Sequence, residues 1–191
     1  MATPRSQRIG IWIIAILMLL GVFGTSAAMM LSPKIQSIDQ AQQKKDYEKY
    51  LEQQNKAIQA NADNSEPLAG YSSRIFDANS VTKLNVEVLK RGTGPKIKET
   101  DSISSSYFGW TSNGKIFDSS KKKSADDKAI SFSLSGVIPG WTNGLTGIEE
   151  GSVVRLTIPA DLAYGPQVSV TIPANSPLEF IVEIHKIVTN V

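Results

Sequence analysis

The stretch of this sequence best suited to chemistry runs from Gly136 to Gly165 and is rich in apolar and aromatic side chains. Ile138, Trp141 and Tyr164 stand there among closely spaced glycines, whereas carboxylates are few and dispersed. The stretch contains neither cysteine nor histidine. Chemistry performed here would therefore depend on shape, exclusion of water and hydrogen bonds rather than on a nucleophile or a metal.

The amino-acid composition excludes several further classes of functional site. The 191-residue chain has no cysteine, which excludes disulfides, thiolate zinc sites and cysteine nucleophiles. His185 is the single histidine, so triads and multi-histidine metal centres are nearly excluded too. The formal net charge of +2 is too small to indicate a basic surface for binding nucleic acid. We therefore expect no cofactor, no metal and no nucleic-acid partner.

Short strands and one short helix are predicted over residues 71–191, which we interpret as one compact domain. Apolar and polar residues alternate over residues 84–90, 103–107, 130–134, 154–158 and 178–184. A helix is predicted over Pro139–Ile148, and its three glycines cost about 1 kcal/mol each relative to alanine. The helix should therefore be held by packing. The expected fold class is α+β, a single antiparallel sheet packed on one side and wrapped around one short helix.

An uncharged apolar run over residues 9–33 follows Arg5 and Arg8. A helix over residues 9–31 would be about 34 Å long, enough to cross a hydrocarbon core of about 30 Å. The arginines favour a cytoplasmic N-terminus and export of the rest. We therefore expect residues 1–31 to be a cytoplasmic stub and a single-pass cell-membrane anchor, with the domain extracytoplasmic. The alternative is a cleaved signal peptide and a secreted protein, because small residues stand near the end of the run.

Residues 32–70 are predicted to form a helical, polar spacer. Ser32-Pro33 is a typical helix start, and polar helix formers dominate as far as Asn64. Leu51 and Ile58 are seven residues apart, but no heptad repeat is sustained. We interpret the spacer as solvated, and a self-association or partner helix is the alternative.

Several motifs resemble those of the FK506-binding-protein (FKBP) family of peptidyl-prolyl cis-trans isomerases, in order and at nearly the family spacing. They are SYFGW…GKIFDSS, VIPGW, LTIPADLAYG and TIPANSPLEFIVEI, and LNVEVLKRGTGP is similar to the family's opening strand and turn. The resemblance covers roughly residues 84–188 and implies an FKBP-like fold with isomerase (rotamase) activity. Together with the expected export of the domain, the resemblance implies that the protein helps exported proteins to fold.

The resemblance also implies a set of site residues. The implied catalytic residues are Tyr107, Phe117, Asp118, Ile138, Trp141, Tyr164 and Phe180, and the implied substrate-binding residues are Ile130, Val137 and Ile172. Trp141 would form the floor, the Tyr164 hydroxyl and the Ile138 N–H would bind substrate, and Asp118 with Tyr107 would form the polar end. The implied partners are Xaa-Pro segments of client proteins, together with macrolide ligands of the FK506 type.

Prolyl isomerisation suits a site that has no nucleophile. Its barrier of about 18–20 kcal/mol is the amide resonance that is lost when the C–N bond twists. A catalyst can lower this barrier by removing the amide from water and by binding the twisted form better than either planar form. A concave aromatic site with one or two hydrogen-bonding groups at its rim meets that demand.

The sequence departs from the family pattern at a few places. The segment GPQVSVT, residues 165–171, lacks the histidine and glycine often found there, Ile130 stands where an aromatic residue is common, and Ser106 replaces a frequent histidine. These departures concern substrate preference and macrolide affinity more than activity. Residues 121–123, three lysines, are interpreted as a solvated loop, with a charged substrate contact as the alternative.

Two functions of other classes stay open on the sequence alone. The domain could bind proline segments without catalysis, or it could serve as an envelope scaffold on the cell surface, because fold does not determine function. Binding without rate enhancement in an isomerisation assay would favour the binding module.

Overall fold

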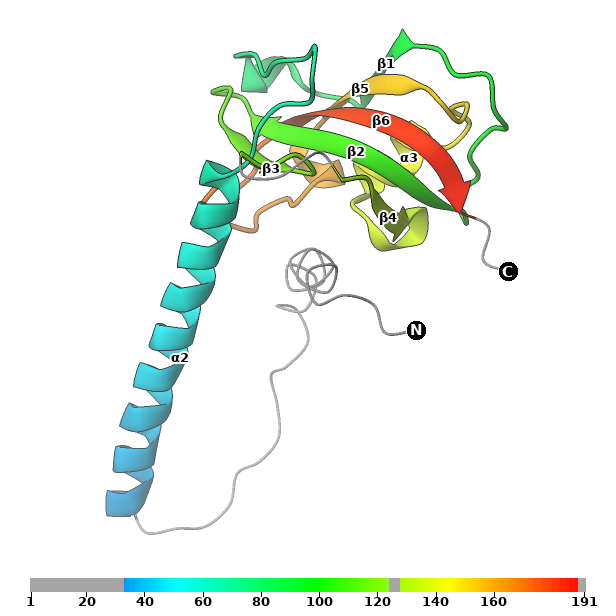
Figure 1. Ribbon diagram of the computed structural model, residues 1–191. Coiled ribbons are helices and arrows are strands. Elements are labelled where there is room, and N and C mark those ends of the chain that lie inside the picture. Colours follow the sequence, from blue (N-terminus) through cyan, green and yellow to red (C-terminus); the bar gives the residue numbers. More distant parts are fainter. Residues whose placement is uncertain (1–32, 124–127, 189–191) are drawn as a thin grey trace. The chain divides into compact units, whose positions relative to one another are not determined.

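The computed structural model describes residues 33–123 and 128–188 of the chain (Figure 1). The expected membrane span, residues 9–31, lies outside these ranges. None of the helices within them is both long enough and apolar enough to cross a membrane. The chain divides into two compact units, Met1–Asp46 and Tyr47–Val191, and the second unit contains the whole sheet and the short helix that packs on it.

A long helix, α2, covers Pro33–Asp63, where the sequence predicts a helical spacer. Its residues from 40 to 50 are exposed, but Ala62 in its last turn is buried. The helix ends where the Ser65 hydroxyl donates to the Asn61 carbonyl over 2.7 Å. The spacer is therefore solvated at Tyr47 and Tyr50 but packed at its carboxyl end.

Six antiparallel strands form one sheet from the residues that come after α2 in the sequence (Figure 1). The strands are β1 (Asn85–Lys90), β2 (Ser102–Thr111), β3 (Ile116–Ser119), β4 (Ile130–Ser133), β5 (Val153–Ile158) and β6 (Leu178–Val188). Their order is β1-β5-β6-β2-β3, and β4 pairs with β2. The long central pair, β2 and β6, extends from Ser102 opposite Val188 to Thr111 opposite Leu178, with one register shift between Ser104 and Ser105. The α+β class with an antiparallel sheet and a short helix is confirmed.

The short helix, α3, covers Pro139–Leu145 and packs on strand β5 through its glycines. A Cβ added at Gly140 would lie 2.3 Å from Cγ2 of Ile158, so only glycine permits this approach. The helix ends earlier than predicted because Gly147, just beyond it, has a φ of 85°, the left-handed conformation that terminates helices. Three 3₁₀ turns, η1 (Ala78–Ser80), η2 (Leu134–Gly136) and η3 (Ala160–Leu162), complete the described elements.

The expectation that the sheet packs on one side only is wrong. Phe108 and Trp110 of β2 and Ile181 of β6 are fully buried in a second cluster, separate from the one that contains Trp141 of α3. The segment that follows α2 covers them, with Leu68 buried in the same cluster and Phe76 packed against it. Strands β2 and β6 are therefore buried on both faces over much of their length.

Candidate active site

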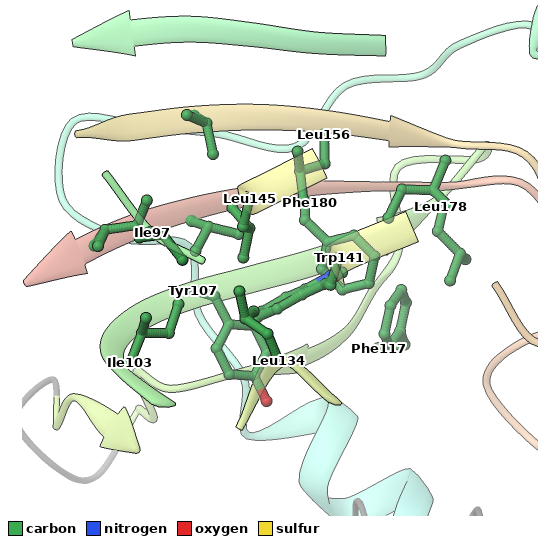
Figure 2. Packing of buried hydrophobic residues seen from close by; sticks show 14 of the residues in the cluster. Ile97, Ile103, Tyr107, Phe117, Leu134, Trp141, Leu145, Leu156, Leu178 and Phe180 are labelled. Carbon is green, nitrogen blue, oxygen red and sulfur yellow. The ribbon is translucent and has the colours of Figure 1, made fainter. Parts of the chain in front are cut away.

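An aromatic cluster on the α3 side of the sheet is centred on Trp141 (Figure 2). Its indole makes edge-to-face contacts with Tyr107 of β2, Phe180 of β6 and Phe132 of β4, each with ring centroids 5.2 Å apart. Phe117 of β3 contacts Phe180 in the same manner at 5.5 Å. Four strands and one helix thus supply rings to one place, and edge-to-face pairs are a favourable packing for aromatic side chains.

The structure brings the sequence-predicted apolar residues together in this cluster. Tyr107, Phe117, Trp141, Ile172 and Phe180 are buried in it, and Ile130, Val137, Ile138 and Tyr164 are partly buried and packed against it. The remaining predicted residue, Asp118, joins the cluster by accepting a hydrogen bond from the Tyr107 hydroxyl. The predicted set is therefore one constellation in space, although the role of each member stays a prediction.

Local structure explains how two of these residues reach the cluster. Ile138 directly precedes α3, and its carbonyl accepts from the Trp141 N–H over 2.9 Å, while its own N–H has no acceptor among the described residues. Ile172 follows the loop 165–171, where a turn holds it: the Ser169 N–H donates to the Ile172 carbonyl at 2.9 Å. The Ile172 N–H donates back to the Ser169 hydroxyl at 3.0 Å.

The carboxylate of Asp118 accepts four hydrogen bonds from residues that the structure describes. Its Oδ2 accepts from the Tyr107 hydroxyl at 2.5 Å. Its Oδ1 accepts from the Ser119 N–H at 2.9 Å, from Asn61 Nδ2 at 2.9 Å and from Lys122 Nζ at 3.3 Å. Donors to an ionised acceptor make the stronger class of hydrogen bond, so this arrangement holds the carboxylate in a defined orientation.

Two phenols next to this carboxylate are held in their neutral form. Burial raises the pKa of Tyr107 well above its usual value of 10, and the negative charge of Asp118 and the hydrogen bond to it act in the same direction. Burial, followed by the charge of Asp118, raises the pKa of Tyr164 to about 12. Both hydroxyls are therefore protonated donors at neutral pH, and neither can act as a base there.

Three residues that contact the site were not predicted from the sequence. The alternating pattern places Phe132 only in a strand, yet its ring contacts Trp141. The interpretation of residues 121–123 as a solvated loop is wrong for Lys122, which makes an ion pair with Asp118. Asn61 belongs to the predicted spacer, and no local pattern connects it with a residue 57 positions later. Within the described ranges no group of three or more potential metal ligands occurs.

Comparison with known proteins identifies the family of the domain. Residues 94–185 match the model of the family described as FKBP-type peptidyl-prolyl cis-trans isomerase. The chain carries an FKBP-type peptidyl-prolyl cis-trans isomerase domain. The resemblance inferred from the motifs is thereby confirmed for the domain, whereas a membrane anchor is not shown.

Individual FKBP-type relatives cover different shares of the chain. The FKBP-type peptidyl-prolyl cis-trans isomerase FkpA of Escherichia coli K12 is 42% identical over 105 residues, which is 55% of this chain and 38% of that protein. FkpA of Aeromonas hydrophila is 35% identical over 128 residues, which is 67% of this chain and 47% of that protein. The chain thus spans less than half the length of these curated relatives.

A solved structure supports the fold. The crystal structure of a peptidyl-prolyl cis-trans isomerase from Pseudomonas syringae pv. tomato aligns with a TM-score of 0.50 and 28% identity. The alignment covers 72% of this chain and 96% of that one.

Proposed function

We propose that the FKBP-type domain catalyses the cis-trans isomerisation of Xaa-Pro bonds in client proteins. The observation that carries the proposal is the joint placement of the predicted apolar residues around Trp141, with Asp118 bound to Tyr107 at one end. The family match supports the same activity. A non-catalytic binding module could use a similar cluster, so the rate of isomerisation is the quantity to measure.

The geometry suits a mechanism without proton transfer. A proline ring packed on the Trp141 indole would leave water behind, which favours the less polar twisted amide over the planar one. Ile138 and Tyr164 pack against the cluster, and we expect the Ile138 N–H and the Tyr164 hydroxyl to bind substrate carbonyls. Asp118 fixes the Tyr107 hydroxyl, so the polar end is oriented before substrate arrives.

The test is an isomerisation assay with an Xaa-Pro model peptide and the full chain. We expect the rate of cis-trans exchange to rise in proportion to protein concentration. A macrolide of the FK506 type should compete with the peptide if it occupies the same cluster. Peptide binding without faster exchange would contradict the proposed catalysis and support the binding module.

We also propose that the domain acts outside the cytoplasm, on exported proteins, and is held at the cell membrane by residues 9–31. Support comes from the sequence alone, from the uncharged apolar run behind Arg5 and Arg8. Protease added to intact cells should degrade the domain, and the membrane fraction should contain the full-length chain. A mature N-terminus at the small residues near Ala28 would overturn the anchor and support secretion.

A further inference from the structure

The last turn of helix α2 lies against strand β3, within the same compact unit that begins at Tyr47. In that turn, Asn61 donates from Nδ2 to Oδ1 of Asp118 over 2.9 Å. The two residues are 57 positions apart, so the contact belongs to the tertiary fold. A residue of the expected spacer thus contacts the candidate active site directly.

Backbone pairing holds this turn in place. The chain just after α2 pairs with the chain just after β3: the Lys123 N–H donates to the Asn64 carbonyl at 2.9 Å, and the Glu66 N–H donates to the Lys121 carbonyl at 3.1 Å. The residues between them form an isolated antiparallel bridge. These bonds fix the end of α2 relative to β3, so the Asn61 amide meets Asp118 in a defined geometry rather than by chance contact of a loose helix.

The donors around Asp118 divide between its two oxygens. Asn61, Lys122 and the Ser119 N–H all donate to Oδ1, and the Tyr107 hydroxyl donates to Oδ2. The terminal torsion of an aspartate is broad, so the carboxylate rotates unless hydrogen bonds stop it. Asn61 contributes a neutral donor to Oδ1, which leaves Oδ2 facing Tyr107.

We propose that Asn61 is a positioning residue of the isomerase site and acts through Asp118 on Tyr107. The proposal rests on the proposed function and extends it, because it makes the end of α2 part of the active site. Among the described residues, the ionisable groups that face Asp118 are Lys122, Tyr107 and Tyr164, and Asn61 adds a hydrogen bond to this set without adding charge. The activity of the domain then depends on where the end of α2 lies.

A double-mutant cycle on the full chain tests the proposal. Asn61→Ala should lower kcat/KM for an Xaa-Pro peptide by about tenfold or more, the size expected for one hydrogen bond to a charged group. In an Asp118→Ala background the same substitution should cause no further loss, because its target is gone. Equal losses in both backgrounds would overturn the proposal, since they would mean that Asn61 acts on the fold as a whole.

Two further variants serve as controls for the double-mutant cycle. Asn55→Ala removes an exposed asparagine from the same helix and should leave kcat/KM unchanged. Asn61→Asp keeps the size of the side chain but replaces the donor with a charge that repels Asp118, so it should lower kcat/KM at least as much as Asn61→Ala. Full activity of Asn61→Asp would contradict the positioning role.

A second measurement does not depend on activity. The hydroxyl proton of Tyr107, identified by its loss in Tyr107→Phe, should shift in the proton NMR spectrum of Asn61→Ala but not in that of Asn55→Ala. An unmoved resonance would overturn the proposal. If the parent chain shows no isomerase activity, the proposed function fails, and the NMR comparison still decides whether Asn61 positions the Asp118–Tyr107 pair.

Discussion

At the scale of single residues, Asp118 pairs with Lys122 in the candidate site, and the two phenols beside Asp118 are neutral. Tyr107 donates to Asp118, and the raised pKa values of Tyr107 and Tyr164 keep both phenols protonated well beyond neutral pH. The two phenols therefore offer orientation and hydrogen bonds and are not poised to exchange a proton near pH 7.

The first prediction concerns Asp118→Asn, which keeps the shape of the side chain and much of its hydrogen-bonding capacity. We expect reduced but measurable isomerase activity, with little pH dependence between about 6 and 8 in either protein, because the adjacent phenols do not ionise there. The measurement is kcat/KM for an Xaa-Pro peptide across this range. A bell-shaped profile in the parent that vanishes together with all activity in Asp118→Asn would indicate acid–base catalysis and contradict the mechanism.

A second prediction concerns stability at alkaline pH. Tyr164 has a pKa of about 12 in the folded protein and a usual value of 10 when unfolded, so above pH 10 the unfolded chain loses this proton first. Stability is therefore fully present below pH 10 and falls as pH rises towards 12, by up to about 1.4 kcal/mol per pH unit for one such group. Urea unfolding at pH 9 to 11.5 should show a shallower loss in Tyr164→Phe than in the parent. Identical slopes would contradict the assignment.

Trp141 is the subject of the third prediction. Only 5% of this residue is exposed, so Trp141→Ala should destabilise the domain by about 3–5 kcal/mol. A loss of activity in that variant could then come from unfolding as well as from loss of the site. Trp141→Leu fills more of the space and is the better probe. We expect it to remain folded by circular dichroism and to lose most isomerase activity and peptide binding. Unchanged peptide turnover in that variant would remove Trp141 from the site.

At the scale of elements, the close contact between α3 and β5 places Trp141. Gly140→Ala would put a Cβ 2.3 Å from Cγ2 and 2.9 Å from Cδ1 of Ile158. Alanine favours a helix by about 1 kcal/mol over glycine, but overpacking costs about 1–3 kcal/mol and pushes α3 from the sheet.

We therefore predict that Gly140→Ala lowers the free energy of unfolding, measured in urea, and lowers isomerase activity because Trp141 is the next residue. Gly136→Ala is the matched control: a Cβ there meets nothing within 4 Å, so its effect should stay within about 0.5 kcal/mol. A Gly140→Ala protein as stable as the parent would show that α3 does not need this close approach.

The strands and the short helix could be predicted from sequence because each carries its own local pattern. The alternation over residues 84–90 and 178–184 corresponds to β1 and β6, and the glycines of α3 already indicated a helix held by packing. Burial on the second face of the sheet could not be predicted in this way. Phe108 and Trp110 alternate as outward residues, and only the tertiary path of the segment after α2 shows that they are covered.

In the candidate site too, local motifs predict some residues, whereas others depend on the tertiary fold. The motifs between Tyr107 and Phe180 were enough to select residues that the structure brings into one cluster. The contacts of Lys122 and Asn61 with Asp118 depend on how the end of α2 and the loop after β3 meet, and neither residue lies in a distinctive pattern. Long-range polar contacts of this kind leave no periodic signal in a sequence.

At the scale of the whole molecule, the segment after α2 covers the second face of the sheet. Leu68 is buried in the second cluster, and the backbone carbonyl of Arg74 accepts a hydrogen bond from the Trp110 indole at 3.0 Å. The guanidinium of Arg74 also pairs with the buried carboxylate of Glu179 at 2.6 Å. These residues belong to the compact unit Tyr47–Val191, and the domain start expected at Tyr71 stays a prediction.

The last prediction rests on this boundary and compares two fragments, one starting at Tyr47 and one at Tyr71. The shorter fragment lacks Leu68 and Asn61, so it exposes part of the apolar surface of Phe108 and Trp110 and loses the contact to Asp118. Burying a leucine contributes about 1.5–3 kcal/mol. We therefore expect the fragment from Tyr71 to unfold at a lower urea concentration and to have lower kcat/KM than the fragment from Tyr47.

Leu68→Ala in the longer fragment should reproduce the loss of stability, by about 2–4 kcal/mol, but not the loss of activity, because it leaves Asn61 in place. Equal stability and activity of the two fragments would show that residues 47–70 are a spacer alone.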